Sequence, residues 1–381
     1  MKLKKNFVLK MNIMAFVKGF TLIMSFLCYF FQFPLPFLSS LIVPFLVFYI
    51  IMNFFSIKLD CEPLLLLLIT VFFIFLGIGI FKSGIKEVEF SRIIRFLEIL
   101  SMLVICLFIK DFHFQKTYNF IILLAVLKSL VLVCIGIYLI KLGSHINIRN
   151  WVESKSMGDI YLQHGIPKVQ VQGNGLIPAL FMIDFTKRKK LTFVNSILFL
   201  GSVFAGNFAF ILGIFLFAII RIVQYIKKYD RYGLIILFCM LIGLTMLPYT
   251  YNYLEYKTLQ KSHSNSLKVE QMIILADTNL IIGNGLGSYI QKQGKYRTYN
   301  GNIYYEIQSF YILNQIGIIA FVLFLIISCF KIYKNDKTAL YLYLLYLFYS
   351  FFNPYSFDTT HMFVIIILEN LYRNKMSNYL S

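Results

Sequence analysis

The sequence predicts an all-α integral membrane protein, a polytopic helical bundle of about twelve transmembrane helices with two long extracytoplasmic loops. Three observations lead to this fold class. Of the 381 residues, 59% are hydrophobic and 14% are charged, more apolar surface than a soluble fold of this length can bury. The apolar runs are about 17–25 residues long, which suits a membrane-spanning helix. They are also continuous, whereas barrel strands alternate over about ten residues.

The predicted spans are joined by short connections, except where the two long loops separate them. In chain order they are 12–33, 36–57, 63–81, 93–109, 118–140, 174–186, 191–204, 207–226, 233–250, 308–330, 338–352 and 360–372. The first is expected to be a retained span, because a signal peptide has a shorter apolar core and a cleavage site of small residues. Residues 1–381 are therefore expected to form a single integral membrane domain.

The positions of lysine and arginine predict the orientation. With both termini in the cytoplasm, most basic residues fall in inner loops, as in the run 187–190, and this agrees with the positive-inside rule. The tight connections 32–36 and 205–207 then face outward without charge, although the outer loop 81–95 is basic. The long polar segments 143–173 and 251–305 also face outward. These features predict a multi-pass protein of an inner or plasma membrane.

Charge and cysteine usage exclude other classes. The net charge is +19, but the basic residues lie at helix ends and in loops rather than in a patch that would bind nucleic acid. The six cysteines lie in or beside apolar runs, without the spacing of a disulfide framework or a zinc site. The five histidines are scattered. No metal or cofactor is expected.

Three glycines at alternate positions, Gly283, Gly285 and Gly287, form the sharpest local pattern. Glycine permits a tight turn or a close backbone approach to a ligand. The pattern predicts either substrate binding or a structural turn that closes the outer loop onto the membrane. A dinucleotide site is excluded because the spacing is wrong and no strand precedes it.

Further candidates are charged residues near the outer interface. Glu306, at the mouth of a span, could accept a proton or be a solvated loop carboxylate. Arg92, Arg95 and Glu98 are spaced along one helix face, where the arginines could clamp a phosphate or simply snorkel beside an internal ion pair. Lys128 lies within a span, and a buried cation there is usually functional or paired.

Residues 265–317 resemble the O-antigen polymerase and O-antigen ligase superfamily of bacterial envelope proteins. The resemblance rests on the run 266–271, the glycine pattern 282–288, and Glu306 followed eleven positions later by Gly317. Asn353-Pro354-Tyr355 before the last span and the large outer loop before the last three spans are also similar. Ligases have a histidine where this chain has Glu306, which favours the polymerase. Many relatives carry Ser-Arg-Gly where this chain has Ala205-Gly206-Asn207.

The resemblance implies a metal-independent glycosyltransferase of lipopolysaccharide or capsule biosynthesis. Its donor and acceptor would be glycans linked to undecaprenyl diphosphate, a chain-length regulator protein would be a candidate partner, and Glu306 would take the proton from the attacking hydroxyl. The expected catalytic cations are Arg297 and Arg149. The expected substrate-binding residues are Arg92, Arg95, Lys168, Lys268, Gly283, Gly285, Gly287 and Tyr305, and Trp151, Tyr299 and Tyr304 could stack on sugars.

Three alternatives stay open. An O-antigen ligase would join finished polysaccharide to the lipid A core. A flippase or other transporter of lipid-linked oligosaccharides would place charges midway through the bilayer, where only Lys128 is conspicuous. A sensor or scaffold is also compatible, because no catalytic motif stands alone.

Overall fold

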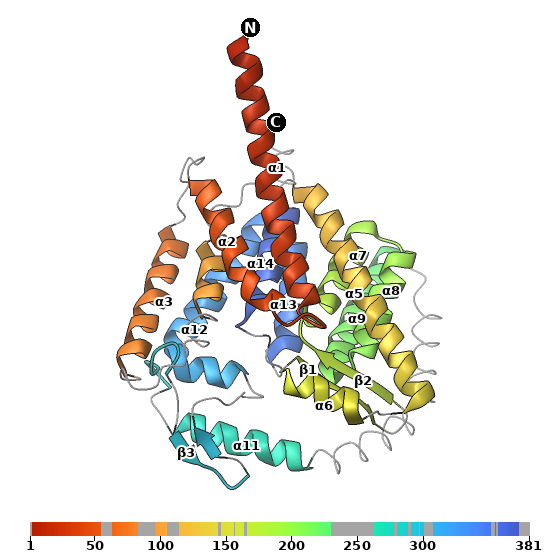
Figure 1. Ribbon diagram of the computed structural model, residues 1–381, viewed down its shortest axis with the longest axis vertical. Coiled ribbons are helices and arrows are strands. Elements are labelled where there is room, and N and C mark those ends of the chain that lie inside the picture. Colours follow the sequence, from red (N-terminus) through yellow and green to blue (C-terminus); the bar gives the residue numbers. More distant parts are fainter. Residues whose placement is uncertain are drawn as a thin grey trace.

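Helices make up most of the described chain in this computed structural model (Figure 1). The structure describes residues 2–54, 63–82, 96–104, 114–143, 146–155, 157–163, 166–229, 262–277, 280–288, 291–296, 298–300, 308–351, 355 and 357–372. The helices are α1 (Lys2–Phe31), α2 (Leu38–Phe54), α3 (Pro63–Lys82), α5 (Phe114–Leu142), α6 (Ile146–Ser154), α7 (Leu176–Arg188), α8 (Phe193–Phe204), α9 (Phe208–Tyr229), α11 (Ser262–Ala276), α12 (Gln308–Asn335), α13 (Lys337–Phe351) and α14 (Thr359–Tyr372). Residues 96–104 are also helical.

Each predicted span within the described residues coincides with a helix, which confirms the helical prediction for those ranges. The span 233–250 lies outside the described residues. Two segments, Lys116–Leu142 of α5 and Ser309–Asn335 of α12, are long and apolar enough to cross a membrane. Several shorter apolar helices accompany them. The number of spans stays a prediction.

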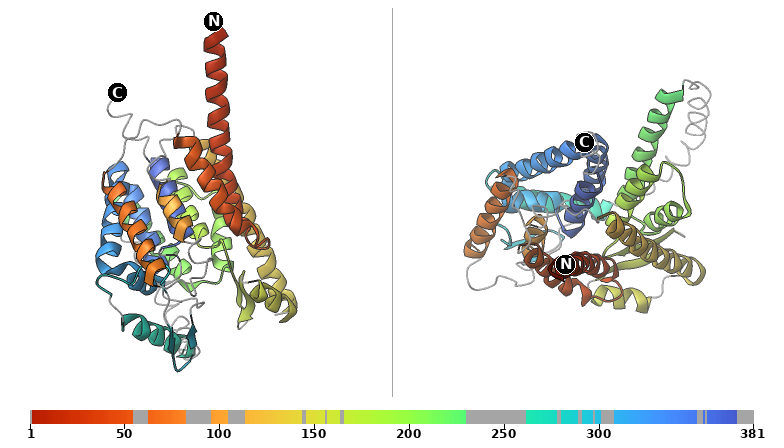
Figure 2. Two further views of the ribbon diagram at one scale, coloured as in Figure 1. Left: turned by 60° about the vertical axis from the view of Figure 1, so that its left-hand side comes forward. Right: turned by 90° about the horizontal axis from the view of Figure 1, so that it is seen from above.

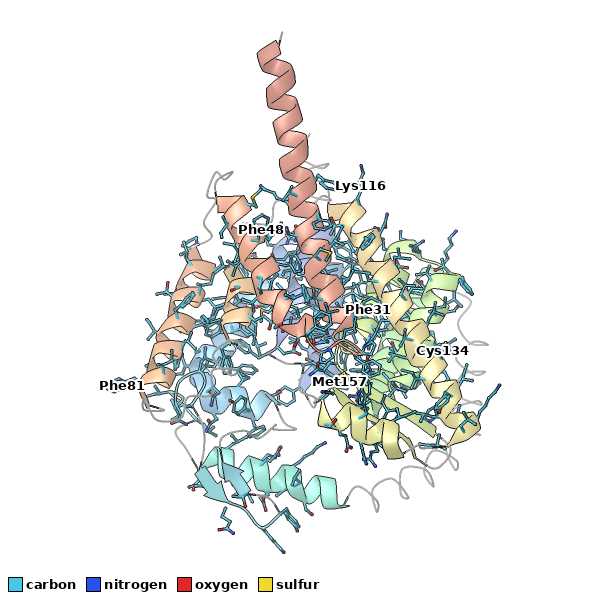
Figure 3. The ribbon with its side chains drawn as sticks, viewed as in Figure 1. Phe31, Phe48, Phe81, Lys116, Cys134 and Met157 are labelled. Atoms are coloured by element: carbon cyan, nitrogen blue, oxygen red, sulfur yellow. The ribbon has the colours of Figure 1, made fainter. Side chains whose placement is uncertain are left out.

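The polar elements gather at one end of the helices. α6, the strands, and α11 lie at the end opposite the start of α1 (Figures 1 and 2). We call this the lower end, and the end with the start of α1 the upper end. Lys116 marks the upper end (Figure 3), and Lys187 joins it there, with Nζ 4.5 Å from the ring centroid of Tyr118.

The two long polar segments contain regular structure that the sequence did not predict. In the first, β1 (Gly158–Gln163) and β2 (Ile166–Val171) pair antiparallel, with Tyr161 opposite Lys168. In the second, β3 (Gln291–Gln293) pairs antiparallel with β4 (Thr298–Asn300). Hairpins pair backbone groups that a bare loop would leave to solvent.

The core is built around α14, which is buried from Thr360 to Asn370 and contacts α5, α7, α12 and α13. Aromatic side chains fill the space beside it, as where the ring of Phe363 lies 4.1 Å from that of Phe26. The neighbouring α12 is interrupted at Gly317, whose φ of 77° and ψ of 164° are not helical. The predicted span 308–330 is therefore two helical pieces joined at a break.

Candidate functional site

The glycine pattern is part of a segment, Leu280–Ser288, that docks on the break in α12. We call this segment the glycine string. The backbone N–H of Asn284 donates to the carbonyl of Asn314 at 2.8 Å, and Ile318 N–H donates to the carbonyl of Leu280 at 2.8 Å. In an uninterrupted helix, Ile318 N–H would instead bond to Asn314 O. The break at Gly317 thus releases helix backbone groups, and the string pairs with them.

The side chain of Gln315 fastens the end of the same string. Its Oε1 accepts from Gly287 N–H at 2.7 Å, while its Nε2 donates to the carbonyl and the hydroxyl of Ser288, each at 3.0 Å. Gln315 is fully buried, and a buried amide needs such partners. The neighbouring Asn314 donates to the carbonyl of Leu275 in α11 at 3.4 Å.

Close packing explains why the string contains glycine. A Cβ on Gly283 would lie 2.5 Å from the Gly317 nitrogen, and one on Gly285 would lie 2.6 Å from the Gly79 Cα in α3. Both residues have positive φ, which glycine adopts without steric cost. Gly287 also has positive φ, but no heavy atom lies within 4 Å of its Cβ position. Their role in substrate binding stays a prediction.

A charged and aromatic group, which we call the Tyr161 cluster, occupies the first polar segment. Arg149 of α6 donates from Nε to Asp159 Oδ1 at 2.8 Å, from Nη2 to Asp159 Oδ2 at 3.0 Å, and from Nε to Glu153 Oε1 at 3.1 Å. Its guanidinium carbon lies 5.1 Å from the Tyr161 ring centroid, and Lys168 Nζ lies 5.3 Å from the same centroid. Lys168 also donates to the Tyr161 hydroxyl at 3.4 Å.

Two groups of this cluster, Arg149 and Tyr161, have a raised pKa. The hydrogen bond to Asp159 raises the pKa of Arg149, with further support from the charges of Asp159 and Glu153. Burial raises the pKa of Tyr161, and the charge of Asp159 acts in the same direction. Tyr161 is therefore a neutral phenol beside two cations, Arg149 and Lys168.

The hairpin register brings together two cations that were predicted as separate site residues from the sequence. Tyr161 and Lys168 are directly opposed in the hairpin, and Arg149 reaches the same ring from α6. Since Asp159 holds Arg149 through two nitrogens, an anion that binds Arg149 would have to displace that carboxylate or share the guanidinium with it. Asp159 and Tyr161 were not predicted, because their relation to Arg149 depends on the hairpin.

A third polar group surrounds the start of α14. Thr359 donates to Glu98 Oε1 at 2.7 Å, Thr360 donates to Asp358 Oδ2 at 2.8 Å, and the hydroxyls of Tyr29 and Thr360 share a hydrogen bond of 2.7 Å. Of the predicted trio at 92–98, only Glu98 is described, and it is buried. Thr359, Thr360 and Asp358 were missed; the only signal was their proximity to the Asn353-Pro354-Tyr355 motif.

Several predicted site residues lie outside the described part of the chain. They are Glu306, Arg297, Tyr305, Arg92, Arg95 and Tyr304. Lys268 lies on α11 and is partly buried, while Lys128 is fully buried in α5, donating to the carbonyl of Phe33 at 3.4 Å. The glycine string and the Tyr161 cluster occupy different sides of the lower end (Figures 1 and 2).

Comparison with protein-family models, curated proteins and solved structures finds no match. Among the described residues, no group of three or more histidine, cysteine or acidic side chains is arranged to hold a metal ion.

Proposed function

We propose that this chain is a membrane glycosyltransferase that polymerises undecaprenyl-diphosphate-linked repeat units into O-antigen or capsular polysaccharide. The observation that carries the proposal is the placement of the polar elements. Those of both long polar segments lie at one end of a helical bundle (Figure 1). An enzyme that joins lipid-linked glycans needs a polar chamber on the membrane face where those glycans are displayed.

The charge distribution supports an extracytoplasmic position for the lower end. Lys116 and Lys187 lie at the upper end, in the region where the positive-inside rule puts the cytoplasm. The uncharged turn 205–207 lies with the first polar segment, because Gln170 of β2 donates to the carbonyl of Gly206 at 3.3 Å. The proposal therefore includes about twelve spans, both termini in the cytoplasm, and a bacterial inner membrane.

The docking of the glycine string supports a role for the residues that follow it. It joins α3 to the break in α12 through hydrogen bonds, which fixes Ser288, the point from which the chain continues towards residue 306. Glu306 would then accept the proton of the attacking hydroxyl, a contribution of about 10²–10⁴-fold. Arg297, Arg149 and Lys168 would stabilise the charge that develops on the diphosphate leaving group.

The test is the surface glycolipid profile of a deletion strain complemented with variants. Glu306→Ala should be present at the wild-type level and should abolish long-chain polysaccharide. Asp277→Asn is the control, because this carboxylate lies in the same polar segment and its side chain is 67% exposed. Normal chain lengths with Glu306→Ala would remove Glu306 from the mechanism.

The same gel separates the polymerase from the ligase. Loss of a polymerase leaves a single repeat unit on the lipid A core, whereas loss of a ligase leaves none. A transporter of lipid-linked oligosaccharide is the candidate from another class, and two observations favour it: the buried Lys128 midway along α5 and the break at Gly317. If the protein were a transporter, its deletion would remove surface glycan altogether. The Glu306→Ala variant would then still support normal polysaccharide.

A further inference from the structure

An exposed apolar stripe runs along α5 and ends close to α6. Its members recur every three or four residues, the spacing of one helix face. They are Phe120, Leu123, Leu127, Leu130, Cys134 and Ile137. The stripe is about 26 Å long at the rise of an α-helix, close to the roughly 30 Å thickness of a bilayer core. Exposed lysines flank it, Lys116 before and Lys141 after.

These lysines define where a bilayer around α5 would end. Long cationic side chains at the end of a span extend towards the lipid headgroups. The chain leaves α5 at Gly143, which has a positive φ of 77°, and α6 begins at Ile146. α6 then runs across the lower end rather than along the bundle (Figure 1). It therefore starts within five residues of the lipid boundary set by Lys141.

The faces of α6 are chemically distinct. Val152 is buried against the protein, whereas Ile148 is 40% and Trp151 is 46% exposed. Ile148 and Trp151 are three positions apart and so share a face. Arg149 and Glu153, four positions apart, form the ion pair on the other side of Val152. An exposed apolar edge beside a charged edge is typical of a helix that lies in a membrane interface.

We propose that α6 is an interfacial helix whose Ile148 and Trp151 insert into the outer headgroup layer of the bilayer that surrounds α5. The occupant of this surface is phospholipid, because α6 begins nine residues after the end of the stripe that lipid would cover. Tryptophan favours this depth, since its ring is apolar and its N–H is polar. The inference rests on the membrane-spanning part of the proposed function and not on glycosyl transfer.

This position has a consequence for the Tyr161 cluster. Arg149 is two residues from Trp151 on the same helix, and Lys168 meets Arg149 at the Tyr161 ring. Seating Trp151 among the headgroups would hold both cations close to that layer, on the other side of α6. α6 would then set the height at which a lipid-linked diphosphate meets the protein.

The chain contains a single tryptophan, so the intrinsic fluorescence of the full-length protein reports on Trp151 alone. In phosphatidylglycerol–phosphatidylethanolamine vesicles we expect blue-shifted emission and protection from iodide. A nitroxide on the lipid headgroup should quench it more strongly than a nitroxide deep in the acyl chain. A Trp151→Phe, Leu130→Trp variant provides the depth control, because residue 130 lies within the stripe and should show the reverse order.

Two results would overturn the inference while the control behaves as expected. Emission that iodide quenches fully and neither nitroxide affects would place Trp151 in water. Protection from iodide without nitroxide quenching would show that a protein covers it, either a partner or a second copy. Failure of the Leu130→Trp control would instead contradict the membrane-spanning arrangement. Neither readout depends on Glu306 or on polymer formation. Failure of this inference can therefore be told apart from failure of the proposed glycosyl transfer.

Discussion

The two polar segments at the lower end are fastened to the helices in different ways. The second is held through its glycine string, whose backbone pairs with the broken helix α12 and with Phe75 O through Leu286 N–H at 2.8 Å. The first is held by glycine contacts at its margins, where a Cβ on Gly173 would lie 2.6 Å from Tyr29 O. Its charged groups form ion pairs whose side chains are partly exposed.

Because of this difference, the two segments should be sensitive to different kinds of substitution. Buried backbone bonds at a helix break leave little room for a side chain and lose their partners if the string moves. Exposed ion pairs contribute little to stability and are screened by salt. The second segment should therefore respond to added methyl groups. Charge changes in the first should affect function more than stability.

The largest expected effect is at the break in α12. Gly317→Ala places a methyl group 2.5 Å from the Ile282 carbonyl carbon at a residue with φ of 77°. Overpacking costs about 1–3 kcal/mol, and backbone strain adds about 1–3 kcal/mol. Thermal unfolding of the detergent-solubilised protein should show a much lower midpoint.

Gly287→Ala is the matched control for this change. It shares the positive φ but has open space at its Cβ position, so it should lose only the strain contribution. Equal midpoints for the two variants would mean that the string does not pack on the break.

A smaller effect should separate two glycines in one turn of α3. Gly79→Ala would place its methyl group against the Leu286 backbone, whereas Gly77→Ala meets nothing within 4 Å. We expect Gly79→Ala to cost about 1–3 kcal/mol from overpacking, and Gly77→Ala to be neutral or slightly stabilising, because alanine favours helix. Midpoints of unfolding compare them directly. Similar behaviour of both variants would contradict the contact between α3 and the string.

The smallest effect on stability should come from the Tyr161 cluster. Asp159→Asn weakens an ion pair whose arginine side chain is 44% exposed, so the change should stay below about 1 kcal/mol. If Arg149 binds the diphosphate, Arg149→Ala abolishes long-chain polysaccharide while Asp159→Asn preserves it. Equal polysaccharide loss in both variants, at wild-type protein levels, would make the ion pair structural rather than catalytic.

The helices were predictable from the sequence, whereas the contacts between them were not. Long apolar runs such as 118–140 fix helices directly, because lipid or core must cover them. The break at Gly317 was not predicted, since Ile316 and Ile318 continue the apolar run on both sides. The resemblance had grouped the glycine string with Gly317, and the structure brings them into contact across more than thirty residues.

The candidate site was predictable in composition but not in arrangement. Arg149 and Lys168 were chosen as external cations. Their meeting at Tyr161 depends on the β1–β2 register, and a one-residue slip in a hairpin would reverse every side chain. The threonines at the start of α14 gave no periodic signal because they act as hydrogen-bond partners of Glu98 and Asp358.

The central claim is that both polar segments lie on one extracytoplasmic face, and cysteine labelling tests it most directly. In a cysteine-free background, Lys155→Cys, Lys295→Cys and Lys190→Cys each introduce one thiol at an exposed residue. A membrane-impermeant maleimide applied to intact spheroplasts should label residues 155 and 295, and should reach residue 190 only after the membrane is permeabilised. Labelling of residue 190 in intact cells, or protection of either 155 or 295, would contradict the account.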